Sequence, residues 1–122
     1  MPNPFVHIEL TSANLEDSKR FYGSLFDWKL EQAPPEHGMD YTIIKVGEGT
    51  GGGMIQHQMP GMPSVWVPYV QIDDVRARTE KAKSLGARII RDVEEIPGDG
   101  GSFSIIQDPT GAVFGLYEPT RK

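Results

Sequence analysis

The most informative absence in this sequence is cysteine, which does not occur among its 122 residues. Without cysteine the chain cannot form disulfide bonds, thiolate nucleophiles, iron–sulfur clusters or thiolate zinc sites. The remaining composition, 38% hydrophobic and 24% charged, is typical of one globular domain rather than of a disordered chain. We therefore expect a single domain in the cytoplasm, where disulfides are rare.

Positive charge and long apolar runs are also scarce. Lysine and arginine number 12 against 17 acidic residues, which gives a formal net charge of −5, and no basic stripe is present. Binding to phosphate backbones or anionic membranes then lacks its main driving force. No apolar run approaches the roughly 18 residues of a membrane span, and the first residues lack the basic and apolar regions of a secretory signal. The sequence therefore predicts neither a nucleic acid nor a membrane as partner.

The hydrophobic pattern of the first half predicts a strand, a helix and three more strands. Polarity alternates over residues 5–10, which places His7 and Glu9 on the same face of a strand. Asn14 is a suitable N-cap for the helix that follows, and this helix extends to about residue 26. Its apolar stripe, expected to face the sheet, consists of Leu15, Phe21, Tyr22, Leu25 and Phe26. The three strands are expected at residues 28–32, 41–46 and 52–58.

The same order of elements returns in the second half. After a Pro/Gly-rich bridge at residues 59–63, a strand at 65–72 leads into a helix that Asp74 caps and that ends at Gly86. Three more strands are expected at residues 87–93, 103–107 and 112–117. We therefore predict one domain over residues 1–122 that contains two βαβββ modules, the first at about residues 5–58 and the second at about 65–118.

Constant offsets between the two halves support an internal repeat. At an offset of 60 residues His7 falls on Val67 and Leu15 on Val75. At an offset of 62 the matched pairs are Tyr41 with Phe103, Ile43-Ile44 with Ile105-Ile106, and Gly53 with Gly115. Each half then has one amphipathic helix on one face of a four-stranded sheet, which is an α+β arrangement, and the other sheet face is left for a partner or a ligand.

Four segments match a known family pattern. They are His7-Ile-Glu-Leu10 with the following Asp17-Ser-Lys-Arg-Phe-Tyr22, Tyr69-Val-Gln-Ile-Asp-Asp-Val75, Leu85-Gly86, and Gln107-Asp-Pro-Thr-Gly-Ala-Val-Phe-Gly-Leu-Tyr117. Through these residues the chain resembles the vicinal oxygen chelate superfamily, which includes glyoxalase I, extradiol dioxygenases and bleomycin-resistance proteins, and in particular its short glyoxalase-like branch. The resemblance implies that the two modules form a curved, barrel-like mixed sheet with the helices on its outer face.

The resemblance also locates the positions at which related proteins bind a metal. Metal-using members carry one ligand on the first strand and one on the last strand of each module, and these positions match His7, Gly53, Val67 and Gly115. Only His7 can bind a metal. Because a catalytic metal needs at least three protein donors, the resemblance implies this fold without the usual metal mechanism, and we expect no cofactor. Binding of a divalent metal stays an open alternative, since a register shift of one or two residues would place Gln56, His57, Tyr69 or Glu118 at the ligand positions.

Two other patterns give alternative interpretations. The spacing of His7, Glu9 and the distant His57 matches the facial triad of non-haem iron sites, although the two helical stripes do not suit the jelly roll that usually carries it. The glycines of residues 47–52 match the dinucleotide-binding pattern, but Pro60 and Pro63 prevent the helix that this motif requires. Neither pattern predicts a cofactor site here.

The sheet face opposite the helices supplies the candidate site. His7 and Glu9 are the candidate catalytic residues, and their proximity could tune either as a base. The candidate ligand-binding residues are His57, Tyr69, Gln71, Phe103 and Tyr117, because a mixed apolar and polar wall suits a small organic molecule. The alternative is that these side chains only fill the interior, with His7 and Glu9 hydrogen-bonded to each other.

The function predicted from these observations is metal-independent binding of a small organic molecule. If the protein is an enzyme, we expect a lyase or isomerase that transfers a proton next to a carbonyl group. Two alternatives are a ligand-sequestering protein of the bleomycin-resistance type, without catalysis, and a metal-dependent lyase or dioxygenase. The apolar stretch at residues 59–67 suggests unburied surface, and we expect a homodimer.

Overall fold

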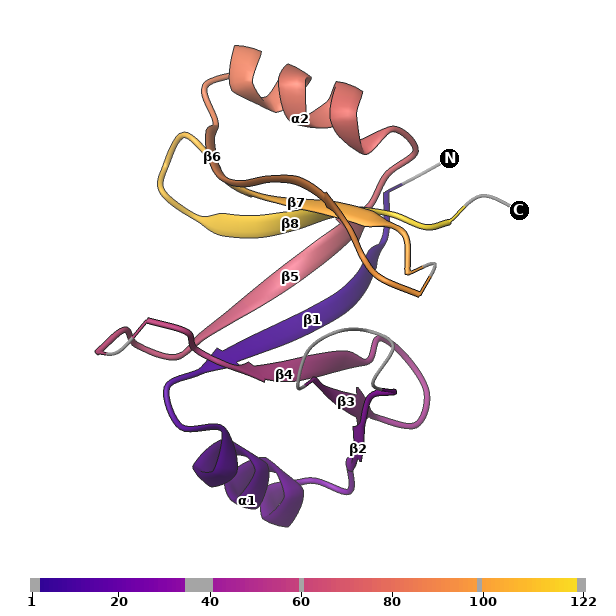
Figure 1. Ribbon diagram of the computed structural model, residues 1–122, viewed down its shortest axis with the longest axis vertical. Helices are drawn as coiled ribbons and strands as arrows, with labels where there is room; N and C mark the ends of the chain where they lie inside the picture. Colours follow the sequence, from indigo (N-terminus) through magenta and orange to yellow (C-terminus); the bar gives the residue numbers. More distant parts are fainter. Residues whose placement is uncertain (1–2, 35–40, 60, 99, 121–122) are drawn as a thin grey trace. The chain divides into compact units, whose positions relative to one another are not determined.

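The computed structural model describes residues 3–34, 41–59, 61–98 and 100–120, so Pro60 of the predicted bridge lies outside the described residues. Figure 1 shows the order βαβββ twice, which confirms the predicted α+β fold class. The first set is β1 (Phe5–Ser12), α1 (Leu15–Leu25), β2 (Lys29–Gln32), β3 (Thr42–Lys45) and β4 (Gly52–Gln56). The second set is β5 (Val65–Gln71), α2 (Val75–Ser84), β6 (Arg88–Glu95), β7 (Ser102–Gln107) and β8 (Val113–Glu118).

The chain divides into two compact units, and each is described by itself. The N-terminal unit is His7–Val67, and the C-terminal unit combines Met1–Val6 with Pro68–Lys122. The first residues belong to the C-terminal unit because the Gln71 amide donates to the Pro4 carbonyl at 2.9 Å. The boundaries between the units therefore fall inside β1 and inside β5.

Both units have the same sheet topology. The strand order is β2-β3-β4-β1 in the N-terminal unit and β5-β8-β7-β6 in the C-terminal unit. The pair β1–β4 is parallel, with Glu9 opposite Gly53, and the pair β5–β8 is parallel, with Tyr69 opposite Gly115. All other described neighbours within each unit are antiparallel. The predicted offset of 62 residues between Gly53 and Gly115 is thus an equivalence of position in the two sheets.

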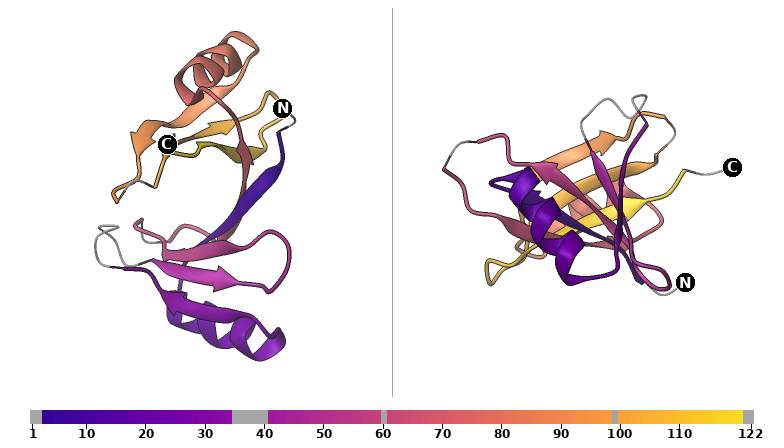
Figure 2. Two further views of the ribbon diagram at one scale, coloured as in Figure 1. Left: turned by 90° about the vertical axis from the view of Figure 1, so that its right-hand side faces the viewer. Right: turned by 90° about the horizontal axis from the view of Figure 1, so that it is seen from below.

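In each unit the helix packs on one sheet face through a small aliphatic core (Figure 2). The buried core of the N-terminal unit contains Leu10, Leu15, Ile44 and Met54, and that of the C-terminal unit contains Ile72, Val75, Ile106 and Leu116. Leu15 corresponds to Val75 at the predicted offset of 60 residues. At the offset of 62, Ile44 corresponds to Ile106 and Met54 to Leu116. Each buried side chain of this size contributes roughly 1.5–3 kcal/mol relative to its exposed state, so the repeat preserves the residues that hold helix to sheet.

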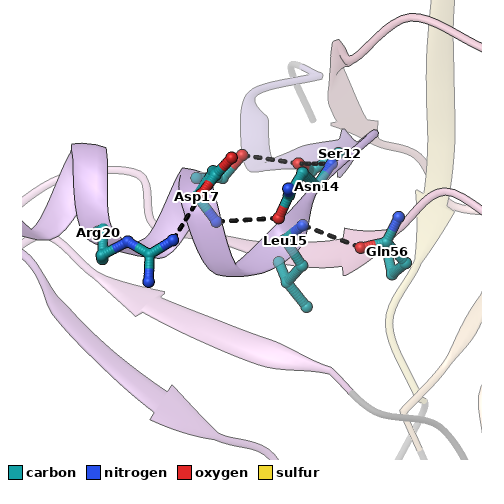
Figure 3. A network of polar contacts seen from close by, with 7 residues as sticks. Ser12, Asn14, Leu15, Asp17, Arg20 and Gln56 are labelled. Carbon is teal, nitrogen blue, oxygen red and sulfur yellow. Dashed lines mark hydrogen bonds and ion pairs between the residues drawn. The ribbon is translucent and has the colours of Figure 1, made fainter.

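The start of α1 is fixed by two side chains (Figure 3). The Asn14 side chain accepts a hydrogen bond from the Asp17 amide at 3.1 Å, which confirms the predicted N-cap. The Leu15 amide donates to Oε1 of Gln56 at 2.9 Å. Because Gln56 is the last residue of β4, this bond satisfies one of the free N–H groups at the helix start and ties the helix to its own sheet.

The start of α2 repeats this arrangement. Asp74 is the N-cap, as predicted, and accepts from the Ala77 amide at 3.1 Å. The Val75 amide donates to Oε1 of Glu118 at 2.9 Å, and Glu118 is the last residue of β8. The carboxylate also lies at the positive end of the helix dipole, where negative charge is favourable.

The predicted stripe of α1 is wrong for three of its five residues. Leu15 is buried, but Phe21, Leu25 and Phe26 are 58%, 56% and 44% exposed. At 3.6 residues per turn Phe21 and Leu25 lie roughly 80–120° around the helix from Leu15, so the sheet covers only the Leu15 side. Sequence periodicity shows that a helix has an apolar stripe, but not how much of that stripe its own sheet covers.

The two helices are short. Neither of them, within the described part of the chain, has the length and apolar character needed to cross a lipid bilayer.

The turn between β7 and β8 depends on the Asp108 carboxylate. Its Oδ1 accepts from the Thr110 hydroxyl at 2.7 Å, the Thr110 amide at 2.8 Å and the Ala112 amide at 3.0 Å. Gly111 has a φ of 103°, which favours glycine in this turn. The Thr110 hydroxyl, followed by these backbone amides, lowers the pKa of Asp108 below its ordinary value.

We predict that Asp108→Ala lowers the melting temperature and weakens its acid dependence. The lowered pKa in the folded state means that ionised Asp108 stabilises the protein above the ordinary carboxyl pKa of 3.8 and that this contribution is lost as the pH falls through the folded value. Thermal unfolding of the wild type and the variant from neutral pH down to about pH 2 measures the difference. Thr110→Val, which removes one of the three bonds, should give an intermediate result, and an unchanged acid profile in Asp108→Ala would contradict the prediction.

Candidate functional site

A polar cluster of three side chains, His7, Glu9 and Tyr41, lies in the N-terminal unit. His7 and Glu9 alternate with the core residue Leu10 and so project from the face of β1 that does not carry α1. The Tyr41 hydroxyl lies 2.6 Å from His7 Nε2 and donates to Glu9 Oε1 at 3.1 Å. His7 Nε2 is 3.8 Å from the same Glu9 oxygen. The tyrosine hydroxyl therefore bridges the two predicted catalytic residues.

The direction of these hydrogen bonds defines a donor and an acceptor end. Because the Tyr41 proton is directed to Glu9, the short contact with His7 is a hydrogen bond when Nε2 carries a proton and donates to the tyrosine oxygen. Glu9 is then the final acceptor of the chain His7–Tyr41–Glu9. The side chains of His7 and Glu9 remain 35% and 21% exposed, so a ligand can reach them from solvent.

Gly53 provides the space that Tyr41 occupies. A Cβ atom at position 53 would lie 1.9 Å from the Tyr41 hydroxyl oxygen and 2.1 Å from Cζ of the ring, so no side chain fits there while the ring is present. The Tyr41 ring is also stacked on His7, with 6.3 Å between ring centroids and 19° between ring planes. The polar cluster thus depends on a glycine directly opposite Glu9 in β4.

The equivalent layer of the C-terminal unit is apolar. At the repeat offsets His7, Glu9 and Tyr41 correspond to Val67, Tyr69 and Phe103. Tyr69 is buried and lies over Gly115, where a Cβ atom would come within 2.2 Å of two ring carbons. Phe103 meets the Tyr69 ring edge to face at 6.2 Å. The two units therefore share a glycine covered by a tyrosine, but only one of them places an imidazole and a carboxylate beside it.

The structure brings three of the predicted ligand-binding residues together in the C-terminal unit. Tyr69 packs on Phe103, and Phe103 is opposite Tyr117 in the β7–β8 pair. The Tyr117 hydroxyl donates to the Gly100 carbonyl at 2.8 Å, and burial raises the pKa of this phenol above its ordinary value. Gln71 lies at the end of β5, where its carbonyl accepts from the Asn3 side chain at 3.1 Å.

His57 does not join the polar cluster. Its amide donates to the Ser12 carbonyl, and Nδ1 accepts from the Met59 amide at 3.3 Å. Ser12 is at the far end of β1 from His7, a distance of about 16 Å along an extended strand. The structure therefore does not bring His7, Glu9 and His57 together as the facial-triad pattern would require.

Tyr41 is the site residue that sequence reasoning did not identify. It lies 32 residues from Glu9 in the chain, and local periodicity does not relate the two positions. The repeat offset contained the necessary signal, since the counterpart of Tyr41 is Phe103, which was a candidate.

The described residues do not form a catalytic metal site. Within the described ranges, no three His, Cys, Asp or Glu side chains are grouped so that they could hold a metal ion. His7 and Glu9 supply two donors, and the ring of Tyr41 occupies the space beside Gly53, the next position that the resemblance assigns to a ligand. A catalytic metal site needs at least three protein donors.

Comparisons with known proteins agree with the fold. A family model described as "Glyoxalase/Bleomycin resistance protein/Dioxygenase superfamily" matches residues 5–116. Two curated proteins, from Mycobacterium tuberculosis and Mycobacterium bovis, each named "Putative glyoxylase CFP32", are 35% identical over 82 residues. The match covers 67% of this chain but only 31% of each relative, so the matched part spans less than a third of their length.

Solved structures share the fold at low sequence identity. A hypothetical protein of Bacillus halodurans has a TM-score of 0.70 at 17% identity, over 100% of this chain and 98% of its own. Methylmalonyl-CoA epimerase of Mycobacterium tuberculosis has a TM-score of 0.67 at 14% identity, over 96% and 88%. A Streptomyces coelicolor methylmalonyl-CoA epimerase, in complex with 2-nitronate-propionyl-CoA, has a TM-score of 0.69 at 13% identity, over 96% and 97%. These likenesses confirm the predicted glyoxalase-like fold and show the fold alone.

We predict that Gly53→Ala destabilises the protein only while the Tyr41 ring is present. Gly53 does not have a positive φ, so the new methyl group is disfavoured by the ring and not by the backbone. Chemical denaturation should show a loss of about 1–3 kcal/mol in the free energy of unfolding for Gly53→Ala. In a Tyr41→Ala background most of this loss should disappear, which appears as a coupling energy of at least about 0.5 kcal/mol.

The adjacent glycine provides the control. A Cβ atom at Gly52 would lie 1.8 Å from the backbone oxygen of Ile8, which Tyr41→Ala cannot remove. Gly52→Ala should therefore be equally destabilising in both backgrounds. Equal losses for Gly53→Ala in the two backgrounds would show that the ring is not what requires glycine at position 53.

Proposed function

The chain belongs to the Glyoxalase/Bleomycin resistance protein/Dioxygenase superfamily, and from this premise we propose that it binds a small organic molecule at the polar cluster without a metal. We further propose that it transfers a proton at a carbon next to a carbonyl group. The base is Glu9, and the hydrogen-bond donors are His7 and Tyr41. Such a protein is an isomerase or a lyase.

The observation that carries this proposal is the difference between the two equivalent layers. In the C-terminal unit the equivalent layer is closed by Tyr69, which covers Gly115, and by Phe103, which packs on Tyr69. Packing alone therefore requires no imidazole or carboxylate at these positions. Placing partly buried polar groups in a layer that apolar side chains can fill costs free energy. A ligand that uses these groups is the functional reason for their presence.

The geometry supports a specific division of roles. In the resting cluster the Tyr41 proton is bonded to Glu9. When a ligand carbonyl accepts this hydrogen bond instead, the Glu9 carboxylate oxygen loses its donor and is free to accept a proton. The C–H bond next to the carbonyl then breaks, its proton passes to Glu9, and the electron pair moves to the carbonyl oxygen to form an enolate. Hydrogen bonds from Tyr41 and His7 stabilise the enolate oxygen, and return of the proton to carbon completes an isomerisation.

The names of related proteins support the reaction class. The curated relatives are named as putative glyoxylases, and two of the structural neighbours are epimerases of an acyl-CoA. An epimerase inverts one carbon centre, and proton removal and return next to a carbonyl is one way to do so. The polar cluster of this chain, one carboxylate with two hydrogen-bond donors, supplies the groups for the proton removal; inversion further requires that the proton return to the opposite face of the enolate.

The experiment is deuterium exchange, which needs no knowledge of the natural substrate. Acyl thioesters, 2-oxo acids and 2-oxoaldehydes are incubated with the protein in D₂O, and proton NMR follows deuterium incorporation next to the carbonyl. We expect Glu9→Gln to slow the catalysed exchange by at least about a hundredfold. His7→Ala and Tyr41→Phe should slow it less, because each removes one donor to the enolate oxygen and leaves the base.

The control is Glu31→Gln, a carboxylate of the same unit that is paired with Lys45 at 3.1 Å and lies outside the cluster. It should exchange at the wild-type rate. Full exchange activity in Glu9→Gln would contradict the catalytic proposal. Binding of the same compounds without exchange, measured by titration calorimetry and lost in His7→Ala, would instead support the sequestering function.

We also propose that the protein is a homodimer that covers an aromatic patch of the N-terminal unit. The patch consists of Phe21, Tyr22, Phe26, Trp28 and Trp66, whose ring centroids lie between 4.7 and 6.5 Å apart in their closest contacts. Apolar surface of this kind in a small domain is typical of an interaction site. The occupant we propose is a second copy: 82 residues are 31% of each curated relative, so those chains have about 265 residues (82/0.31), enough for two domains of this size.

The dimer is tested by light scattering after size-exclusion chromatography. We expect twice the monomer mass of 13.5 kDa for the wild type and a shift to monomer for Phe21→Glu, which places a charge within the patch. Ile90→Glu, at another exposed apolar side chain in β6, is the matched control and should remain dimeric. A wild-type monomer at micromolar concentration would contradict the proposal.

A further inference from the structure

We infer that the contact of Tyr41 with Gly53 closes a metal site that two substitutions can open. The inference rests on the proposed function, because both concern the polar cluster, but its readout is metal binding rather than ligand turnover. It follows from the strand register, from the space that Tyr41 fills and from a comparison of the two units.

The strand register brings three donor positions together. Position 53 is directly opposite Glu9 in the parallel pair β1–β4, and His7 is two residues along the same face of β1. Paired strands are about 4.8 Å apart, so a carboxylate at position 53 would project beside both side chains. An imidazole and two carboxylates within one such layer form a donor set that zinc and other divalent transition metals accept.

Tyr41 prevents these three positions from binding a metal in two ways. Its ring fills the space of any side chain at position 53, where a Cβ atom would lie within 2.4 Å of three tyrosine atoms. Its hydroxyl also takes part in hydrogen bonds with His7 Nε2 and Glu9 Oε1, the two donor atoms that remain. A metal ligand must present a free lone pair, whereas His7 Nε2 is already engaged in its hydrogen bond with the tyrosine hydroxyl.

The C-terminal unit contains the same covered glycine without the donors. Tyr69 covers Gly115, but the residues equivalent to His7 and Glu9 are Val67 and Tyr69 itself. The two covering tyrosines do not occupy equivalent positions, since the counterpart of Tyr41 is Phe103 and the counterpart of Tyr69 is Glu9. The tyrosine-covered glycine is therefore not a simple consequence of the repeat, and the second unit provides a control within the same chain.

The test is metal titration of the 122-residue chain purified with a chelator. Zinc and nickel are added to the wild type, to Tyr41→Ala/Gly53→Glu and to the control pair Tyr69→Ala/Gly115→Glu, and binding is followed by calorimetry. We expect the first double variant to bind one metal ion per chain at least about tenfold more tightly than the wild type and the control pair. Adding His7→Ala to the first double variant should abolish this gain.

A second variant protects the test against misfolding. Tyr41→Glu retains Gly53 and replaces the phenol with a carboxylate next to the same two donors, so it too should gain metal affinity. Circular dichroism and thermal unfolding verify that each variant is folded. If the folded variants bind no more tightly than the wild type, the inference is overturned while the deuterium-exchange result is unaffected. If the wild type itself binds one zinc ion through His7 and Glu9, the metal-free function is overturned as well.

Discussion

The contact of the Tyr41 ring with Gly53 is the constraint on which the candidate site depends. It holds the phenol hydroxyl between His7 and Glu9, orders both side chains, and fills the space that a fourth side chain would need. A glycine is required because the ring lies against the backbone of β4, and the parallel register with β1 places that glycine opposite Glu9. The chemistry proposed for the site therefore follows from a packing relation between two strands and one side chain.

The two units preserve their framework and differ in their open sheet face. The first amide of each helix donates a hydrogen bond to the last residue of the fourth strand in its unit, Gln56 or Glu118, and each core uses aliphatic residues at matching offsets. These features satisfy helix N–H groups and bury apolar surface, requirements that both units must meet. The layer on the other face is not under the same requirement, and there one unit has a polar cluster while the other has aromatic packing.

Sequence patterns were sufficient for the framework because its determinants are local or periodic. The alternation of β1, the caps Asn14 and Asp74 and the offsets of 60 and 62 predicted the order of elements. The patterns were insufficient where a contact depends on three-dimensional packing. They did not join Tyr41 to Glu9, and they assigned Phe21 to a buried stripe although it is exposed. They did place His7 beside Glu9, because both lie on one strand face.

The reaction we propose without a metal requires another means of stabilising the negative charge that develops on a carbonyl oxygen. In the proposed reaction two hydrogen-bond donors replace the cation, and their effect depends on being held in place before the ligand binds. Tyr41 is held by its contact with Gly53, and His7 is held by stacking on Tyr41. Because Glu9 already accepts the Tyr41 proton, a ligand oxygen that takes this bond activates the base in the same step. In the proposed reaction the three side chains would therefore couple ligand binding to proton removal.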